Sequence, residues 1–215
     1  MEFKTFEELI RHVQSNGKKK RVAVAAAHDS HALEALILAD RDNIATPVLV
    51  GYKEQIQQLL EELGADADAY EIYDTQSDKE SAEKTIELIK EGKADFIMKG
   101  KLQTADLLKA VVNKEKGLSK GKIMSHIAMH EVPTYHKLLA VTDGGMMMYP
   151  DLHEKKQIIE NAVEVFNNIG YECPKVAVLS AVENVNPKMP ETIDADMLRQ
   201  MNRDGDIKNC IVEGP

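Results

Sequence analysis

The sequence predicts an α/β protein in which helices cover mostly parallel sheets. Short apolar runs alternate with helical patterns along almost the whole chain, as in a series of βαβ units. The run RVAVAAAH at residues 21–28 is continuously apolar, as a strand buried on both faces should be. No run approaches the roughly 20 apolar residues of a membrane helix, and the start lacks a signal-peptide core. We therefore expect a cytoplasmic protein.

The first half of the chain alternates strands with helices. The expected strands are 21–28, 47–51, 70–74 and 95–100. The expected helices lie near 30–41, 53–63, 78–92 and 103–112. Ser77 and Glu80 have the spacing of a capping box at the start of the third helix. Because parallel strands need a crossover between them, this series predicts a mostly parallel sheet.

A basic stretch, NKEKGLSKGK at Asn113–Lys122, breaks this alternation with two glycines. We place a domain boundary there, between an N-terminal α/β subdomain at 1–122 and a second α/β subdomain at 123–215. The second subdomain is expected to contain strands at 123–133, 136–143, 175–182 and in the final NCIVEGP run, and helices at about 151–169 and 192–203. A turn at VPT favours antiparallel pairing of its first two strands.

Composition excludes some function classes. The net charge is −9, aromatic residues make up 5% and Trp is absent, which argues against a nucleic-acid-binding protein. The two cysteines, Cys173 and Cys210, lie far apart without ligand spacing, so we expect reduced thiols and no metal site. No Walker A loop, GxGxxG fingerprint or GxSxG elbow is found.

The segment Lys99-Gly100-Lys101 with Thr104 is the best anion-binding candidate. Ligands of open α/β sheets bind at the carboxyl ends of strands, where this segment is expected. Glycine lets the backbone approach a ligand, lysines supply charge, and the N–H groups of a helix start attract anions. An ordinary strand–helix turn with two solvated lysines explains these residues equally well.

Other polar groups follow the expected strands. His28, Asp29 and His31 could bind a metal or act as acid–base groups, but a polar helix start is the favoured interpretation. Adjacent residues on a strand point to opposite faces, so at most one of Ser125 and His126 faces a cleft.

Two further motifs lie beyond the second expected strand pair. Asp143, with Gly144 and Gly145, could contact a ligand or cap a turn. The methionines at 146–148 could line an acyl pocket, although plain core packing is favoured.

Taken together, these motifs resemble a known family. The segments 125–170 and 174–201, with MKGKLQT at 98–104 upstream and DGDIKNCIVEGP at 204–215 downstream, closely resemble phosphate butyryltransferase of the phosphate acetyl/butyryltransferase family. The resemblance implies two α/β subdomains flanking a cleft, with an isocitrate/isopropylmalate dehydrogenase-like fold. It also implies that the C-terminal part is missing from this chain.

The resemblance implies transfer of a butyryl or similar short acyl group from acyl-CoA to inorganic phosphate, giving acyl phosphate and CoA. It implies no metal or redox cofactor, a homodimer or higher homo-oligomer, and an acyl-phosphate kinase as a pathway partner. The serine, arginine and aspartate credited with catalysis in the acetyl branch are expected beyond Pro215. The residues carried over to substrate binding are Lys99, Gly100, Lys101, Thr104, Ser125, His126, Asp143, Gly144, Gly145 and Asn161.

Two other functions stay open at this point. One is a truncated, non-catalytic protein that binds CoA or a phosphate ligand. The other is a metal- and NAD-dependent hydroxy-acid dehydrogenase, which would need clustered aspartates around a divalent ion, and the sequence contains no such cluster.

Overall fold

The computed structural model describes residues 2–15, 17 and 19–215. The chain divides into two compact units, one spanning Leu9–Lys120 and the other combining residues 2–8 with Gly121–Pro215. The sequence analysis placed the first eight residues with the N-terminal subdomain. Residues 2–8 group with the later segment because the Phe3 N–H donates to the Tyr171 hydroxyl at 3.0 Å and the Phe3 carbonyl accepts from the Leu138 N–H at 2.9 Å.

A further helix that was not predicted, α1 (Phe6–Ser15), begins within this N-terminal segment. Its apolar residues Phe6, Leu9, Ile10 and Val13 have the spacing of an amphipathic helix, although none of its residues is buried. Acidic residues in its first turn and His12 in its last turn agree with the helix dipole.

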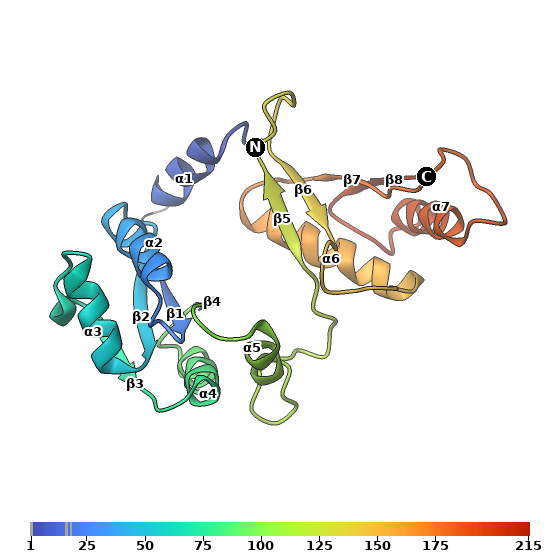
Figure 1. The fold of residues 1–215 in the computed structure, drawn as a ribbon. Coiled ribbons are helices and arrows are strands. Elements are labelled where there is room, and N and C mark those ends of the chain that lie inside the picture. Colours follow the sequence, from blue (N-terminus) through green and yellow to red (C-terminus); the bar gives the residue numbers. More distant parts are fainter. Residues whose placement is uncertain (1, 16, 18) are drawn as a thin grey trace. The chain divides into compact units, whose positions relative to one another are not determined.

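The unit Leu9–Lys120 is built on a four-stranded parallel sheet in the order β3-β2-β1-β4 (Figure 1). Its strands are β1 (Lys20–Ala25), β2 (Ala45–Gly51), β3 (Glu71–Asp74) and β4 (Phe96–Lys99). All four lie where the apolar runs predict them, and their parallel pairing is confirmed.

Helices cover both faces of this sheet. The helices are α2 (Ser30–Arg41), α3 (Lys53–Glu62), α4 (Asp78–Lys90) and α5 (Thr104–Val111), with a short 3-10 helix η1 (Ala67–Ala69) before β3. Val22 and Val24 of β1 belong to a cluster with residues of α2 and α3. Ala25 belongs to a second cluster with α4 and α5. Side chains of β1 that point to opposite faces of the sheet thus pack against different helices, α2 and α3 on one face and α4 and α5 on the other.

The strand order reverses at β1. The chain moves outward from β1 to β2 and β3, and then returns over the opposite face to place β4 on the other side of β1. Such a reversal is a topological switch point, and the carboxyl ends of the two strands that flank it form the usual ligand-binding crevice of an open α/β sheet. In this chain those two strands are β1 and β4.

The start of α4 differs in detail from its prediction. The Ser77 hydroxyl accepts a hydrogen bond from the Glu80 N–H at 3.2 Å, which is one half of the capping box. The Glu80 carboxylate accepts from the Gln76 N–H at 2.8 Å, one residue earlier than a capping box requires. The predicted capping box is therefore only half formed.

The second unit contains two strand pairs and two long helices. Its elements are β5 (Ile127–His130), β6 (Leu139–Thr142), α6 (Leu152–Asn168), β7 (Lys175–Ala177), α7 (Pro190–Arg203) and β8 (Ile211–Glu213). The pair β5–β6 is antiparallel, as predicted, whereas β7 and β8 run parallel. Asp151 and Glu154 form a complete capping box at the start of α6. Ile159 and Val163 of α6 pack with Leu198 of α7 in the core of this unit.

Within the described ranges, no helix is both long enough and apolar enough to cross a membrane.

Candidate functional site

The switch point of the four-stranded sheet joins the ends of β1 and β4. The Gly100 N–H donates to the Ala25 carbonyl, and the Lys101 N–H donates to the Ala26 carbonyl, each at 2.8 Å. The Lys99–Lys101 segment therefore continues the β1–β4 pairing past the end of β4 to the start of the β1–α2 turn. This arrangement holds Lys101 close to the polar residues that follow β1.

Gly100 is required by this close approach. A Cβ atom built on Gly100 would lie 2.2 Å from the Ala26 carbonyl oxygen and 2.9 Å from that of Ala25. Contacts below 3.0 Å with backbone atoms cannot be relieved by a side-chain movement. The glycine is therefore explained by packing of two turns, in addition to any approach of a ligand.

The two lysines of this turn are used differently. The Lys99 ammonium group donates to the carbonyl oxygens of Gly100 and Leu102, at 3.0 Å each, and so braces the turn. Lys101 is exposed, and none of the ion pairs found among the described residues includes its ammonium group. Lys101 is thus the lysine available to an anion.

The start of α5 adds N–H groups to this turn. Thr104 is the first helical residue and is exposed, and Gln103 at the N-cap makes no side-chain cap hydrogen bond. The first N–H groups of a helix have no intrahelical partner, and the helix dipole favours negative charge there. Lys101 and the α5 start together suit an anionic group.

The β1–α2 turn places its three polar residues in different environments. The Asp29 carboxylate caps α2 by accepting from the Ala32 N–H at 2.8 Å, which confirms a polar helix start. His31 is exposed. His28 is buried, with Nε2 4.0 Å from a carboxylate oxygen of Asp78 and its ring centroid 4.4 Å from that of Tyr52. Burial lowers the pKa of His28 below its ordinary value of 6.5, and Lys101 acts in the same direction.

The predicted site residues of the second unit also lie together. Asn161 of α6 donates from Nδ2 to the Ser125 hydroxyl at 2.9 Å and to the Ile123 carbonyl at 3.2 Å. This pair of bonds anchors the segment before β5 onto α6. Ser125 is half-buried and bonded to Asn161, while His126 is exposed. Both residues precede β5, which is shorter than the predicted strand 123–133, so strand alternation does not explain the difference.

The Asp143 carboxylate organises the turn after β6. It accepts hydrogen bonds from the backbone N–H groups of Gly145 and Met146, both at 2.7 Å, and of His126 at 2.9 Å. Burial opposes ionisation of this carboxyl group, but the backbone N–H groups outweigh it and hold the pKa of Asp143 below its ordinary value. The turn-capping interpretation of Asp143 is therefore correct, and Gly144 and Gly145 form the turn that it caps.

The methionines after this turn do not form core. Met148 is 84% exposed and the neighbouring Tyr149 is 90% exposed, while Met146 and Met147 are half-buried. The core-packing interpretation of the Met146–Met148 run is wrong for Met148, because most of its side chain is exposed to solvent.

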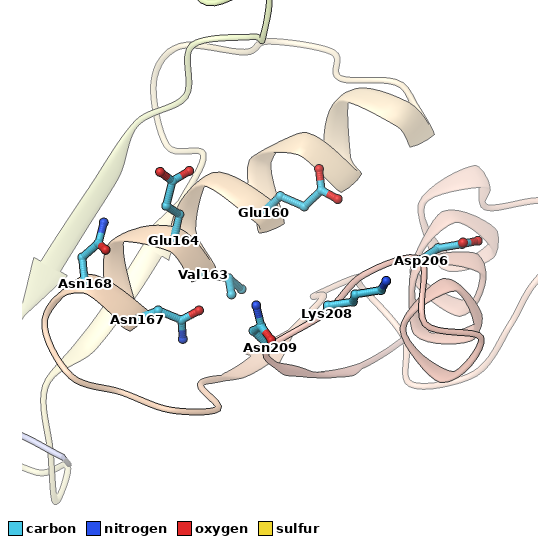
Figure 2. Close-up of a pocket in the computed structure, with 8 residues that line it drawn as sticks. All are labelled: Glu160, Val163, Glu164, Asn167, Asn168, Asp206, Lys208 and Asn209. Atoms are coloured by element: carbon cyan, nitrogen blue, oxygen red, sulfur yellow. The ribbon is translucent and has the colours of Figure 1, made fainter.

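A hollow of about 510 Å³ lies elsewhere in the second unit (Figure 2). It is lined by Glu160, Val163, Glu164, Asn167 and Asn168 of α6 and by Asp206, Lys208 and Asn209 of the α7–β8 loop. Three carboxylates against one lysine disfavour a phosphate-bearing ligand. None of the predicted site residues lines this hollow.

Metal-binding and redox groups are scarce in the described part of the chain. Residues 2–15, 17 and 19–215 contain no group of three or more His, Cys, Asp or Glu side chains that could hold a metal ion. Cys173 is exposed and Cys210 is buried, and both are free.

Comparison with known proteins decides the family. The model of the family described as phosphate acetyl/butaryl transferase matches residues 5–87 and 79–215. The chain belongs to this family. The phosphate butyryltransferase of Clostridium acetobutylicum is 46% identical over 212 residues, which cover 99% of this chain and 70% of that protein.

Two further members of the family support the assignment. The phosphate acetyltransferase of Thermotoga maritima is 42% identical over 201 residues, covering 94% of this chain and 68% of that protein. The crystal structure of a branched-chain phosphotransacylase from Enterococcus faecalis V583 superposes with a TM-score of 0.75 at 28% identity, covering 91% of this chain and 68% of that one. The α/β architecture with a mostly parallel sheet is thus that of a phosphotransacylase.

The predicted site residues of this family member form two groups, one in each unit. Lys99, Gly100, Lys101 and Thr104 share one turn of the Leu9–Lys120 unit, and the other six surround the Ser125–Asn161 and His126–Asp143 contacts. Sequence reasoning missed Asp78 and Tyr52 beside His28. Their positions just after β3 and β2 were the available signal, because those strands end at the same edge as β1.

Proposed function

We propose that the protein is a phosphate acyltransferase that moves a butyryl or similar short acyl group from acyl-CoA to inorganic phosphate. The membership of the family and the names of its relatives, phosphate butyryltransferase and phosphate acetyltransferase, support this proposal. The structural observation that carries it is the turn between β4 and α5, where exposed Lys101 and the start of α5 lie at the switch point of the sheet.

The reaction makes physical demands that this turn can meet in part. A phosphate oxygen attacks the thioester carbonyl, the C–S bond breaks, and the proton carried by hydrogen phosphate ends on the CoA thiol. Phosphate is strongly hydrated, so the enzyme must strip water from it and hold it close to the carbonyl. Lys101 and the N–H groups of α5 can replace part of that hydration. We assign Lys101 and these N–H groups the role of binding an anionic group of phosphate or CoA.

The remaining predicted residues either shape the binding segments or contact substrate in this proposal. Lys99 and Gly100 shape the turn that carries Lys101, through the Lys99 hydrogen bonds and the close contact of Gly100 with Ala26. In the second unit, exposed His126 is the residue that we assign to substrate contact. Asp143 accepts from the N–H of His126 itself, and Asn161 holds the segment just before it through the Ile123 carbonyl and the Ser125 hydroxyl.

The finer expectations belong to the same proposal and rest on the family resemblance. They are a two-subdomain fold of the isocitrate/isopropylmalate dehydrogenase type, homodimers, a cytoplasmic location, no metal or redox cofactor, and an acyl-phosphate kinase as pathway partner. A kinase of this kind would consume the product, because an acyl phosphate is an activated phosphoryl donor.

The test is phosphate-dependent loss of the thioester absorbance of butyryl-CoA, with acetyl-CoA measured in parallel. Absorbance is preferred to a thiol reagent because exposed Cys173 would react with the reagent. We expect turnover that depends on phosphate, and a Lys101→Gln variant with a raised KM for phosphate or acyl-CoA. Lys114→Gln, an exposed lysine of the following loop, is the matched control. Binding of CoA without any turnover would reject the acyltransferase and favour a binding protein.

A further inference from the structure

The buried imidazole of His28 is left unused by the proposed function. Its side chain is only 6% exposed, although histidine carries two polar nitrogens. Among the described residues, its Nδ1 is a buried side-chain atom without a hydrogen-bond partner. An unpaired buried polar atom costs stability, and an apolar ring of similar size would avoid that cost. Such an atom in a folded protein calls for a functional explanation.

Charged and polar groups of several elements lie near His28. Asp78 at the start of α4 faces Nε2 at 4.0 Å, Tyr52 after β2 packs on the ring, and Asp29 is the next residue in the chain. The backbone of Lys101 is bonded to Ala26, two residues before His28. The two carboxylates favour protonation of the imidazole, and the ammonium charge of Lys101 opposes it.

The side of His28 that carries Nδ1 is closed by backbone. A Cβ atom built on Gly51, whose φ is 157°, would lie 3.0 Å from Nδ1 and 3.2 Å from the Ala27 nitrogen. Gly51 therefore packs closely against Nδ1, whereas Asp78, a charged partner of the ring, lies at Nε2.

The connection to the anion-binding turn is direct. The carbonyl of Ala26, two residues before His28, accepts the hydrogen bond from the Lys101 N–H at 2.8 Å. A charge that arrives at the Lys101 turn is therefore placed beside the β1–α2 turn that contains the imidazole.

We propose that His28 couples proton binding to the occupancy of the β4–α5 turn by an anion, and so adjusts the affinity of that turn for its substrate to pH. This inference rests on the proposed function, since it assigns the anion to the Lys101 turn. A bound anion offsets the field of Lys101 and attracts the proton to His28. Because coupling between two binding sites is reciprocal, the anion binds more tightly as His28 becomes protonated.

The test is NMR titration of the full ¹⁵N-labelled chain between pH 5 and 8, with sulfate as the anion. Sulfate keeps its charge over this range, whereas phosphate itself titrates. Samples with chloride at matched ionic strength are the reference, and His28→Gln identifies the imidazole signals. We expect sulfate to shift the amide signals of Gly100–Thr104 and to raise the pKa of His28 by roughly half a pH unit, about a threefold gain in proton affinity.

Three variants separate the contributions. Lys101→Gln should raise the pKa of His28 in chloride, because the opposing charge is gone, and should abolish the sulfate effect. Asp78→Asn should lower the pKa of His28, because an attracting charge is lost. Lys114→Gln, the exposed control lysine, should change neither the pKa of His28 in chloride nor the shift that sulfate causes.

The possible failures are distinguishable. If sulfate shifts the Gly100–Thr104 amides while the pKa of His28 stays constant, the coupling is wrong and the proposed anion site stands. If saturating sulfate leaves those amides unchanged, the anion site of the proposed function is wrong and the coupling falls with it. A Lys101→Gln variant with an unchanged pKa of His28 would also overturn the coupling, whatever sulfate does.

Discussion

The backbone N–H of Lys101 donates to the carbonyl oxygen of Ala26 at 2.8 Å. This single bond ties the turn after β4 to the turn after β1, the two strands that flank the switch point of the sheet. As a result, the charge of exposed Lys101 acts on the buried imidazole of His28. The bond also forces the two backbones so close together that only glycine fits at position 100.

Gly100→Ala should destabilise the protein strongly. The new methyl group would meet the Ala26 carbonyl oxygen at 2.2 Å, so one of the two turns must move and lose its hydrogen bonds. We expect a loss of about 3 kcal/mol in the free energy of unfolding, measured by urea denaturation. Gly145→Ala is the control, because a Cβ atom there meets nothing within 4 Å. Equal losses in the two variants would contradict the close-contact argument.

His28→Phe should remove a pH dependence of stability. The pKa of His28 is lowered in the folded protein, chiefly by burial, so the unfolded chain binds the proton more strongly. The stability contribution is complete above pH 6.5, the ordinary pKa, and is lost as the pH falls from there toward the folded pKa. His28→Phe should lack this loss. At pH 5.5 its free energy of unfolding should equal that of the parent protein or exceed it by up to about 1 kcal/mol.

The measurement is the unfolding free energy of parent and His28→Phe at several pH values between 5 and 8. Exposed His31 provides the control, since His31→Gln should keep the slope of the parent protein. A slope that survives in His28→Phe but disappears in His31→Gln would show that the wrong histidine has been assigned.

Asp143→Asn should weaken the turn after β6. An amide side chain offers one oxygen where the carboxylate accepts from three backbone N–H groups, and its NH₂ group would face a donor. We expect a loss of about 2 kcal/mol at pH 7, followed by denaturant unfolding. Asp42→Asn, an exposed aspartate, should cost far less.

The difference between parent and Asp143→Asn should itself depend on pH. The folded pKa of Asp143 is lowered, so its contribution is fully present above pH 3.8, the ordinary value, and is lost as the pH falls through the folded pKa. The two unfolding curves should therefore converge below pH 3.8. A constant gap down to acid pH would mean that the carboxylate charge plays no part.

Asn202→Ala should loosen β8 from α7. The Asn202 side chain donates to the carbonyls of Ile207 and Cys210, at 2.9 and 3.0 Å, and accepts from the Val212 N–H at 3.0 Å. Removing it leaves three backbone groups without this partner, and we expect a loss of about 2–3 kcal/mol in unfolding free energy. Gln200→Ala on the same helix removes only one exposed hydrogen bond, to Asp204, and should be nearly neutral.

Amide hydrogen exchange gives a local check on the same variant. The Val212 N–H should exchange much faster in Asn202→Ala, while the Gly100 and Lys101 N–H groups of the other unit should be unaffected. Unchanged protection at Val212 would mean that the strand pairing with β7 alone holds β8 in place.

Most elements of the Leu9–Lys120 unit, and the family, follow from the order of the amino acids. Its strands and most of its helices are encoded by local apolar periodicity, which a one-dimensional pattern retains. Helix α1 was missed although Phe6, Leu9, Ile10 and Val13 have helical spacing. The α4 cap was half correct because the Glu80 carboxylate accepts from the Gln76 N–H, and the choice of donor depends on backbone geometry. The substrate-binding roles assigned to the ten predicted residues, and the boundary at residue 122, stay predictions.

The contacts that those residues make depend on how the chain packs. The apolar runs cannot say that β4 lies beside β1, because strand order depends on contacts between distant segments. Around the adjacent ends of β1 and β4, His28 is buried and Lys101 is exposed. The Lys99 ammonium group there donates to two carbonyls. Burial and hydrogen bonding are properties of the packed chain. The different environments of His28, Lys99 and Lys101 could therefore not be predicted from the sequence.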